Sequence, residues 1–354
     1  MAQTTRSIRS RRRFLSGLAA TASLAPLVVT RRARAETRTL YINSWGGSWT
    51  KAQDEAFYKP FTAATGVRIR TVAPVSFAKL KAQVQSGSYE WDLTSINEPE
   101  WLRADREGLA EPIDWSIVEK DKIPPGSVFA NGIAMSTLST ALCYRRDRFP
   151  GGPPRSWADF WDVAKFPGNR SLYENAPRSI IFALLADGVP RDRLYPLDLD
   201  RAFRKLDAIK PHIKVWWTQG NQSQQLLRDG EIDMMPIWNA RASELQQEGV
   251  PVELVWEGAV AYRTMWGVAK GAPNRDLAWR FIQFAVQAKP QADWATRLYY
   301  GPANPQAFAL IPPDIARQLP TYEDHMRVMA EPNAEWIAAH AAEMEERFTS
   351  WLTS

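Results

Sequence analysis

The chain has 354 residues, of which 45% are hydrophobic and 23% charged, so it is long enough to fold as two domains with separate cores. Its formal net charge of +5 comes from the N-terminus, because 8 of the 44 basic residues and no acidic residue lie within residues 1–35. The remaining 36 basic residues face 39 acidic ones, a net charge of −3. This balance argues against nucleic acid or an anionic membrane as a partner.

Residues 1–35 have the pattern of an export signal. The segment Arg11-Arg12-Arg13-Phe14-Leu15 is followed by an uncharged run to Thr30, and Ala33-Arg34-Ala35 offers a small-x-small cleavage site. An arginine pair before an aromatic residue and leucine is typical of the twin-arginine pathway. We therefore predict a twin-arginine signal peptide over 1–35 and a periplasmic location. A basic tail on a cytoplasmic protein is the less favoured alternative.

The next part of the chain alternates strand and helix signals. In chain order we predict a strand at 39–43 and a helix that is opened by the capping-box pair Thr50 and Gln53, kinked or split at Pro60 and ended at Gly66. A strand at 67–72, a helix at 77–85 and a strand at 91–96 follow. This is a βαβ pattern, which predicts a mostly parallel sheet. Ligands bind beyond the carboxyl ends of such strands, so the loops 44–48, 74–76 and 97–98 are candidate contacts.

The second half repeats this alternation and predicts a second α/β lobe. The expected helices are 157–163, 180–186, 222–228, 277–286 and 334–351, and the expected strands are 171–173, 232–237, 252–256 and 262–269. The proline- and glycine-rich segments 150–154 and 301–302 predict loops. The single cysteine, Cys143, lies in the apolar run 140–144, which predicts a buried strand thiol and excludes an internal disulfide.

Several separated segments carry a family resemblance. The segment 226–234 reads Leu-Leu-Arg-Asp-Gly-Glu-Ile-Asp-Met and is followed by Trp238-Asn239, and the other matching segments are Ser44-Trp45-Gly46-Gly47, 156–161 and 300–305. Together they resemble extracellular solute-binding proteins, in particular the spermidine/putrescine-binding branch of periplasmic receptors for ABC importers. The resemblance covers residues 38–353.

This resemblance implies an α/β fold of the two-lobed periplasmic binding protein type (type II-like), with hinge crossovers and a ligand cleft between the lobes. The predicted lobes are 36–142 plus 265–305 and 143–264 plus 306–354. The implied partners are a small-molecule solute and an ABC permease in the inner membrane, and closure occurs by bending at the hinge. We expect a monomer that uses neither cofactor nor metal.

The aromatic residues of the family persist here, whereas most of its ligand-binding acids do not. Trp45, Trp238 and Tyr262 match aromatic positions that suit an alkyl chain or a cation. No glutamate follows Trp45, no acid follows Arg178, and Thr264 stands where the family has an aspartate. Glu98 and Glu174 remain as possible partners for an ammonium group.

Arginines lie near the same positions, and an arginine suits bidentate capture of a carboxylate. The sequence therefore predicts a zwitterionic or carboxylate solute such as an ω-amino acid, with a polyamine as the alternative. Each arginine could instead belong to a structural ion pair, and Asn239 could cap a helix. The complete candidate site is Trp45, Gly46, Gly47, Ser48, Glu98, Glu174, Arg178, Trp238, Asn239, Arg241, Tyr262 and Arg263.

An enzyme is not expected, because the chain lacks His-Glu-x-x-His, Gly-x-Ser-x-Gly, P-loop and dinucleotide-binding motifs. Its three histidines, His212, His325 and His340, are scattered along the sequence. The carboxylate pair of a glycosidase needs no local spacing, so motifs alone leave that alternative open. A ligand-loaded receptor that docks on a membrane sensor instead of a permease would share the fold.

Overall fold

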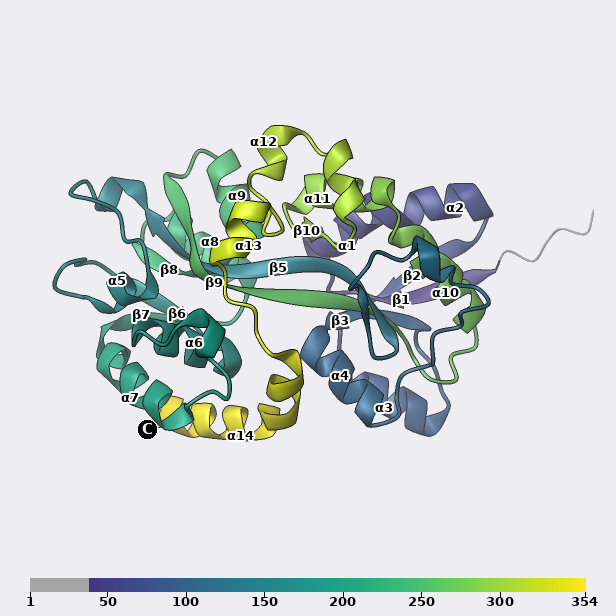
Figure 1. The fold of residues 1–354 in the computed structure, drawn as a ribbon, viewed down its shortest axis with the longest axis horizontal. Helices are drawn as coiled ribbons and strands as arrows, with labels where there is room; N and C mark the ends of the chain where they lie inside the picture. Colours follow the sequence, from purple (N-terminus) through teal and green to yellow (C-terminus); the bar gives the residue numbers. More distant parts are fainter. Residues whose placement is uncertain (1–37) are drawn as a thin grey trace, which may run out of the picture. The chain divides into compact units, whose positions relative to one another are not determined.

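A ten-stranded mixed sheet runs through residues 38–354, the part of the chain that the computed structural model describes (Figure 1). The strand order is β2-β1-β3-β9-β5-β8-β6-β7, and β4 (Val128–Phe129) and β10 (Gly301–Pro302) pair with β5. The predicted signal peptide lies outside the described residues. No helix of residues 38–354 is both long and apolar enough to cross a membrane.

The first βαβ units form as the alternation predicts, with β1 parallel to both β2 and β3. Gly66 and Gly87 end their helices with positive φ values of 72° and 70°, which favour glycine. The elements are β1 Thr39–Asn43, α1 Gly47–Gln53, a π-helical segment Asp54–Tyr58, α2 Lys59–Thr65, β2 Arg68–Val72, α3 Phe77–Ser86, β3 Leu93–Asn97 and α4 Glu98–Arg106.

The predicted capping box is wrong, because α1 begins at Gly47 and Thr50 lies inside it. The Thr50 hydroxyl instead accepts a hydrogen bond from the Gly46 N–H at 3.0 Å and lies 2.6 Å from the Ser44 hydroxyl. The predicted interruption near Pro60 is present as a split: the π-helical segment Asp54–Tyr58 separates α1 from α2, and Pro60 stands in the first turn of α2.

Two long antiparallel strands, β5 (Gly132–Arg145) and β9 (Val252–Val268), run side by side through the middle of the sheet (Figure 1). The sequence predicts two strands where β9 is one. The break in the sequence pattern is a bulge: Val255 pairs with Leu142 and Val260 pairs with Thr140, so the intervening residues of β9 loop out. Gly258 takes a φ of 68° within this bulge.

The second half supplies α5 Trp157–Trp161, β6 Arg170–Tyr173, α6 Ala176–Ala186, α7 Leu199–Ile209, β7 Ile213–Trp217, α8 Gly220–Arg228, β8 Met234–Trp238 and α9 Asn239–Gln247. Strand β6 is parallel to β7 and β8, so this half is a second α/β layer. Sequence patterns predict α5, β6, α6, α8 and β8 but miss α7, β7 and α9.

The C-terminal elements are α10 Arg275–Ala285, α11 Ala288–Leu298, α12 Pro313–Ala316, α13 Glu323–Val328 and α14 Ala334–Thr353. Short 3-10 turns occur at Lys120–Lys122, Arg146–Arg148, Arg191–Arg193, Lys210–His212 and Pro305–Leu310. The predicted loop 301–302 is instead strand β10, paired with Ser136 and Thr137 of β5. Helix α14 packs on both α4 and α6, along the lower edge of Figure 1.

The sheet carries separate hydrophobic cores at its two ends. One contains Trp101, Trp266 and Trp294, and another contains Trp157 and Phe182. Cys143 is fully buried in a third core, which confirms the predicted buried thiol, and burial raises its pKa. The lobe boundaries stay a prediction. Residues 307–319 pack on α11, a helix of the first predicted lobe, although the prediction gives them to the second.

Candidate functional site

A cavity of about 920 Å³ opens where the carboxyl ends of several strands meet. The loops after β1, β2 and β3 contribute Trp45, Val75 and Asn97, so all three loops selected from the sequence reach it. Helices α4, α6 and α14 and strand β9 line it further, together with residues 329–332 before α14. Of the candidate site, the residues that line this cavity are Trp45, Glu98, Arg178, Tyr262 and Arg263.

Arg178 lies in the first turn of α6, whose N-cap residue is Asn175. The Asn175 side-chain oxygen accepts hydrogen bonds from the Arg178 backbone N–H at 3.3 Å and from its guanidinium at 3.0 Å. The guanidinium carbon lies 4.1 Å from the centroid of the Tyr262 ring, a cation–π distance. Within residues 38–354, the buried Arg178 Nε has no hydrogen-bond partner. Arg178 is therefore positioned yet keeps donor capacity for a ligand.

Two tyrosines form an aromatic wall beside Arg178. Burial raises the pKa of Tyr262 to about 12 and raises that of Tyr173 as well, so both phenols stay neutral at physiological pH. The Tyr173 ring stacks on Trp217 with centroids 4.0 Å apart and planes at 9°. This layer gives the cavity a flat apolar surface suited to aliphatic groups.

Glu100, in the first turn of α4, faces the same cavity and is missing from the sequence-based candidates. The Asn97 side-chain amide donates a hydrogen bond to its carboxylate at 3.1 Å. Burial raises the pKa of Glu100, opposed by the Asn97 hydrogen bond and by the charge of Arg178. One signal for it is present in the sequence, because Glu100 follows the selected loop 97–98 at helix N3 spacing from Asn97.

Glu98, at the start of α4, is 6% exposed and forms an ion pair with Arg263 of β9 at 3.3 Å. The Arg263 guanidinium also pairs with Glu331, in the segment before α14, and lies 5.1 Å from the ring of Phe129. Burial raises the pKa of Glu98, and the Arg263 charge opposes this rise. Burial by itself lowers the pKa of the Arg263 guanidinium, but the hydrogen bonds and negative charges of Glu331 and Glu98 outweigh burial and raise this pKa overall.

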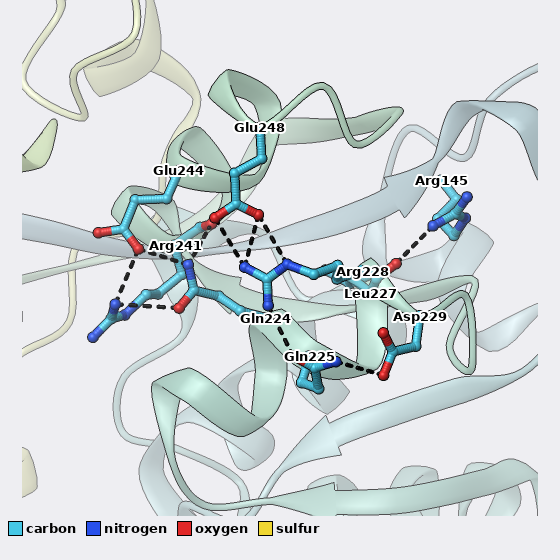
Figure 2. Close-up of polar contacts among 9 residues, drawn as sticks. All are labelled: Arg145, Gln224, Gln225, Leu227, Arg228, Asp229, Arg241, Glu244 and Glu248. Atoms are coloured by element: carbon cyan, nitrogen blue, oxygen red, sulfur yellow. Dashed lines mark hydrogen bonds and ion pairs between the residues drawn. The ribbon is translucent and has the colours of Figure 1, made fainter.

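Arg241 is held elsewhere, in a polar network between α8 and α9 (Figure 2). Its guanidinium donates to Gln224 at 3.2 Å and to Glu244 at 3.0 Å. In the same network Arg228 makes two hydrogen bonds of 2.9 Å to Glu248. This arrangement is the structural ion pair that the sequence leaves open as the alternative for each arginine, and Arg241 does not line the cavity.

Trp238, at the end of β8, stands behind the aromatic wall and does not line the cavity. Its ring packs edge-on against Trp217 and Tyr173, with centroids 5.7 Å and 6.0 Å away. A side chain at Gly220 would place its Cβ 2.8 Å from this ring, so the close approach requires glycine. Trp238 therefore holds Tyr173 in place without lining the cavity itself.

Asn239 is fully buried, and both ends of its side chain bind backbone groups. Its oxygen accepts from the Ser139 N–H at 3.1 Å, and its amide donates to the Tyr299 carbonyl at 2.6 Å. The suggestion that Asn239 caps a helix is wrong, because Trp238 is the N-cap residue of α9. The remaining candidates outside the cavity lining are Gly46, Gly47, the exposed Ser48 and the exposed Glu174.

Comparison with known proteins agrees with this architecture. A family model described as bacterial extracellular solute-binding protein matches residues 56–321. The gamma-aminobutyric acid-binding protein of Pseudomonas aeruginosa is 36% identical over 93% of this chain and 95% of that protein. The spermidine/putrescine-binding periplasmic protein of Escherichia coli is 23% identical over 85% of this chain and 87% of its own.

Among solved structures, an ABC transporter substrate-binding protein from Bradyrhizobium japonicum superposes with a TM-score of 0.85 and 38% identity, covering 89% of this chain and 99% of that structure. The fold is that of the two-lobed periplasmic binding proteins, as predicted, and the family confirms the predicted location outside the cytoplasm. With the strand-end cavity and the matched family model, the chain belongs to the bacterial extracellular solute-binding proteins.

Proposed function

We propose that the protein is the periplasmic receptor of an ABC importer for a small solute with one amino and one carboxylate group, such as γ-aminobutyric acid. The observation that supports this most directly is the presence of Arg178 and Glu100 in one cavity. The likeness to a gamma-aminobutyric acid-binding protein supports the same chemistry.

The two charged groups have opposite signs and come from different elements, α6 and α4. Each is held by one asparagine, Asn175 for Arg178 and Asn97 for Glu100, and neither forms an ion pair within residues 38–354. A zwitterion can therefore place its carboxylate on the Arg178 guanidinium and its ammonium group on Glu100. Its methylene chain would then lie against Tyr262 and Trp45.

Such a ligand would also favour closure of the cleft. Arg178 follows β6 at one end of the sheet and Glu100 follows β3 at the other, and β5 and β9 connect the two ends. A solute bound to both groups interacts fully only when α4 and α6 are close, so binding stabilises the closed form. The closed form is the one that we expect the inner-membrane permease to recognise.

Isothermal titration of the purified protein with γ-aminobutyric acid and with putrescine tests this proposal. We expect γ-aminobutyric acid to bind more tightly than putrescine. Arg178→Gln should weaken γ-aminobutyric acid binding by about 2–3 kcal/mol, roughly 30- to 150-fold, because a charge-assisted hydrogen bond is lost.

Arg241→Gln is the matched control, since it removes an arginine of the polar network on α8 and α9 and should leave affinity unchanged. Tight putrescine binding without γ-aminobutyric acid binding would contradict the proposal and favour the polyamine alternative. Equal losses in the two variants would contradict the role of Arg178.

A further inference from the structure

We infer that Arg263 determines the specificity of this cavity. By pairing with Glu98 it leaves Glu100 as the one described cavity carboxylate that is neither ion-paired nor exposed, so that one ammonium group is accepted and a diamine is rejected. This inference rests on the proposed function, because it assumes that the solute occupies the cavity between Arg178 and Glu100.

The ionisable side chains around the cavity differ in how they are already paired. Arg103 is held by Glu107 at 2.7 Å, and Glu345 and Glu331 are exposed at the surface. Arg263 pairs with two carboxylates, Glu98 and Glu331, which together form a three-residue cluster. The Glu98 side chain is 8% exposed, whereas that of Glu331 is 66% exposed. Both carboxylates line the cavity, but the exposed Glu331 keeps its hydration, so the buried carboxylate whose charge Arg263 compensates is Glu98.

Glu98 and Glu100 are two residues apart at the start of α4, and both line the cavity. Glu98 has an arginine partner, whereas the side-chain partner of Glu100 is the neutral amide of Asn97. In a cavity with two free carboxylates, two ammonium groups could both be paired. With Glu98 already neutralised, the second ammonium group of a diamine would lose its hydration without gaining a counter-charge, which is costly.

An ω-amino acid avoids this cost because its second charge is negative and Arg178 can receive it. The cluster of Arg263 with Glu98 and Glu331 then discriminates by keeping Glu98 paired. Selectivity against the diamine arises because the Glu98 carboxylate is already paired with Arg263 and cannot pair with a second ammonium group. Such discrimination by an unpaired charge is a general way to obtain specificity between similar ligands.

The test is a gain of binding. Arg263→Gln frees Glu98 while retaining a polar side chain, and titration with putrescine and with γ-aminobutyric acid should show the ratio of putrescine affinity to γ-aminobutyric acid affinity rising about tenfold or more. Adding Glu98→Gln to this variant should abolish the gain. Arg263→Lys, which keeps the positive charge, should show no gain. Arg263→Met keeps the aliphatic stem over Phe129 and replaces the glutamine variant if that does not fold.

Removing Arg263 both frees Glu98 and loosens the segment before α14, and Glu331→Gln distinguishes these two effects. This variant breaks the ion pair between Arg263 and that segment but leaves Arg263 paired with Glu98. It should give no gain for putrescine, and a gain equal to that of Arg263→Gln would overturn the inference. So would an unchanged affinity ratio in folded Arg263→Gln and Arg263→Met. These failures differ from failure of the proposed function, which shows in the unmodified protein as absence of γ-aminobutyric acid binding.

Discussion

Replacing Asn239 by alanine should destabilise the protein strongly, because this buried side chain joins three elements. Its oxygen binds the Ser139 N–H of β5, its amide binds the Tyr299 carbonyl after α11, and its own backbone begins α9. Alanine would leave the Ser139 N–H and the Tyr299 carbonyl without these partners. With about 1–3 kcal/mol for each of the two unsatisfied groups, we expect the free energy of unfolding to fall by about 2–6 kcal/mol.

Urea unfolding at 25 °C, followed by tryptophan fluorescence, measures this change. Asn169→Ala is the matched control: the Asn169 side chain also donates to a backbone carbonyl, that of Glu231 at 2.9 Å, but it is exposed to solvent. Water can replace that bond, so the control should lose less than about 1 kcal/mol. If Asn239→Ala lost no more than Asn169→Ala, the reasoning that buried hydrogen bonds at Asn239 hold these elements together would be refuted.

Two further outcomes follow from packing and from charge. Gly267→Ala would push a methyl group into the Trp101 ring, so urea unfolding should show a free energy of unfolding lower by about 1–3 kcal/mol. The control is Gly151→Ala, whose methyl group meets no atom within 4 Å and should be nearly neutral. Equal effects of the two substitutions would contradict the packing argument. Burial raises the pKa of Glu100 above its usual 4.5, so the folded protein holds this proton more tightly than the unfolded chain. The stability that protonated Glu100 contributes is therefore present below about pH 4.5 and is lost as the pH rises through the raised pKa of the folded state. In calorimetric titrations, the affinity for γ-aminobutyric acid should fall as the pH drops from 7.5 towards the raised pKa of Glu100, because the carboxylate becomes protonated. Glu100→Gln should weaken binding and abolish this pH dependence.

Local sequence signals determined much of the fold. The strand 39–43 and the helix from residue 77 lie where the patterns predict them, because alternating or helical periodicity and glycines with positive φ act within a few residues. The separated family motifs likewise identified a solute-binding protein, since they report common ancestry and need no contact between them. By contrast, β9 was predicted as two strands, because a bulge and a chain break have the same sequence pattern.

The composition of the site was decided by tertiary structure. Arg178 and Arg241 are equivalent candidates in the sequence, but α9 directs Arg241 towards Gln224 and Glu244, whereas the start of α6 holds Arg178 under Tyr262 in the cavity. Glu98 is paired by Arg263, which is 165 residues away in the chain. The sequence determined which charged residues exist near strand ends, and only the folded chain determined which of them neutralise each other, because ion pairing depends on distances that long-range packing sets.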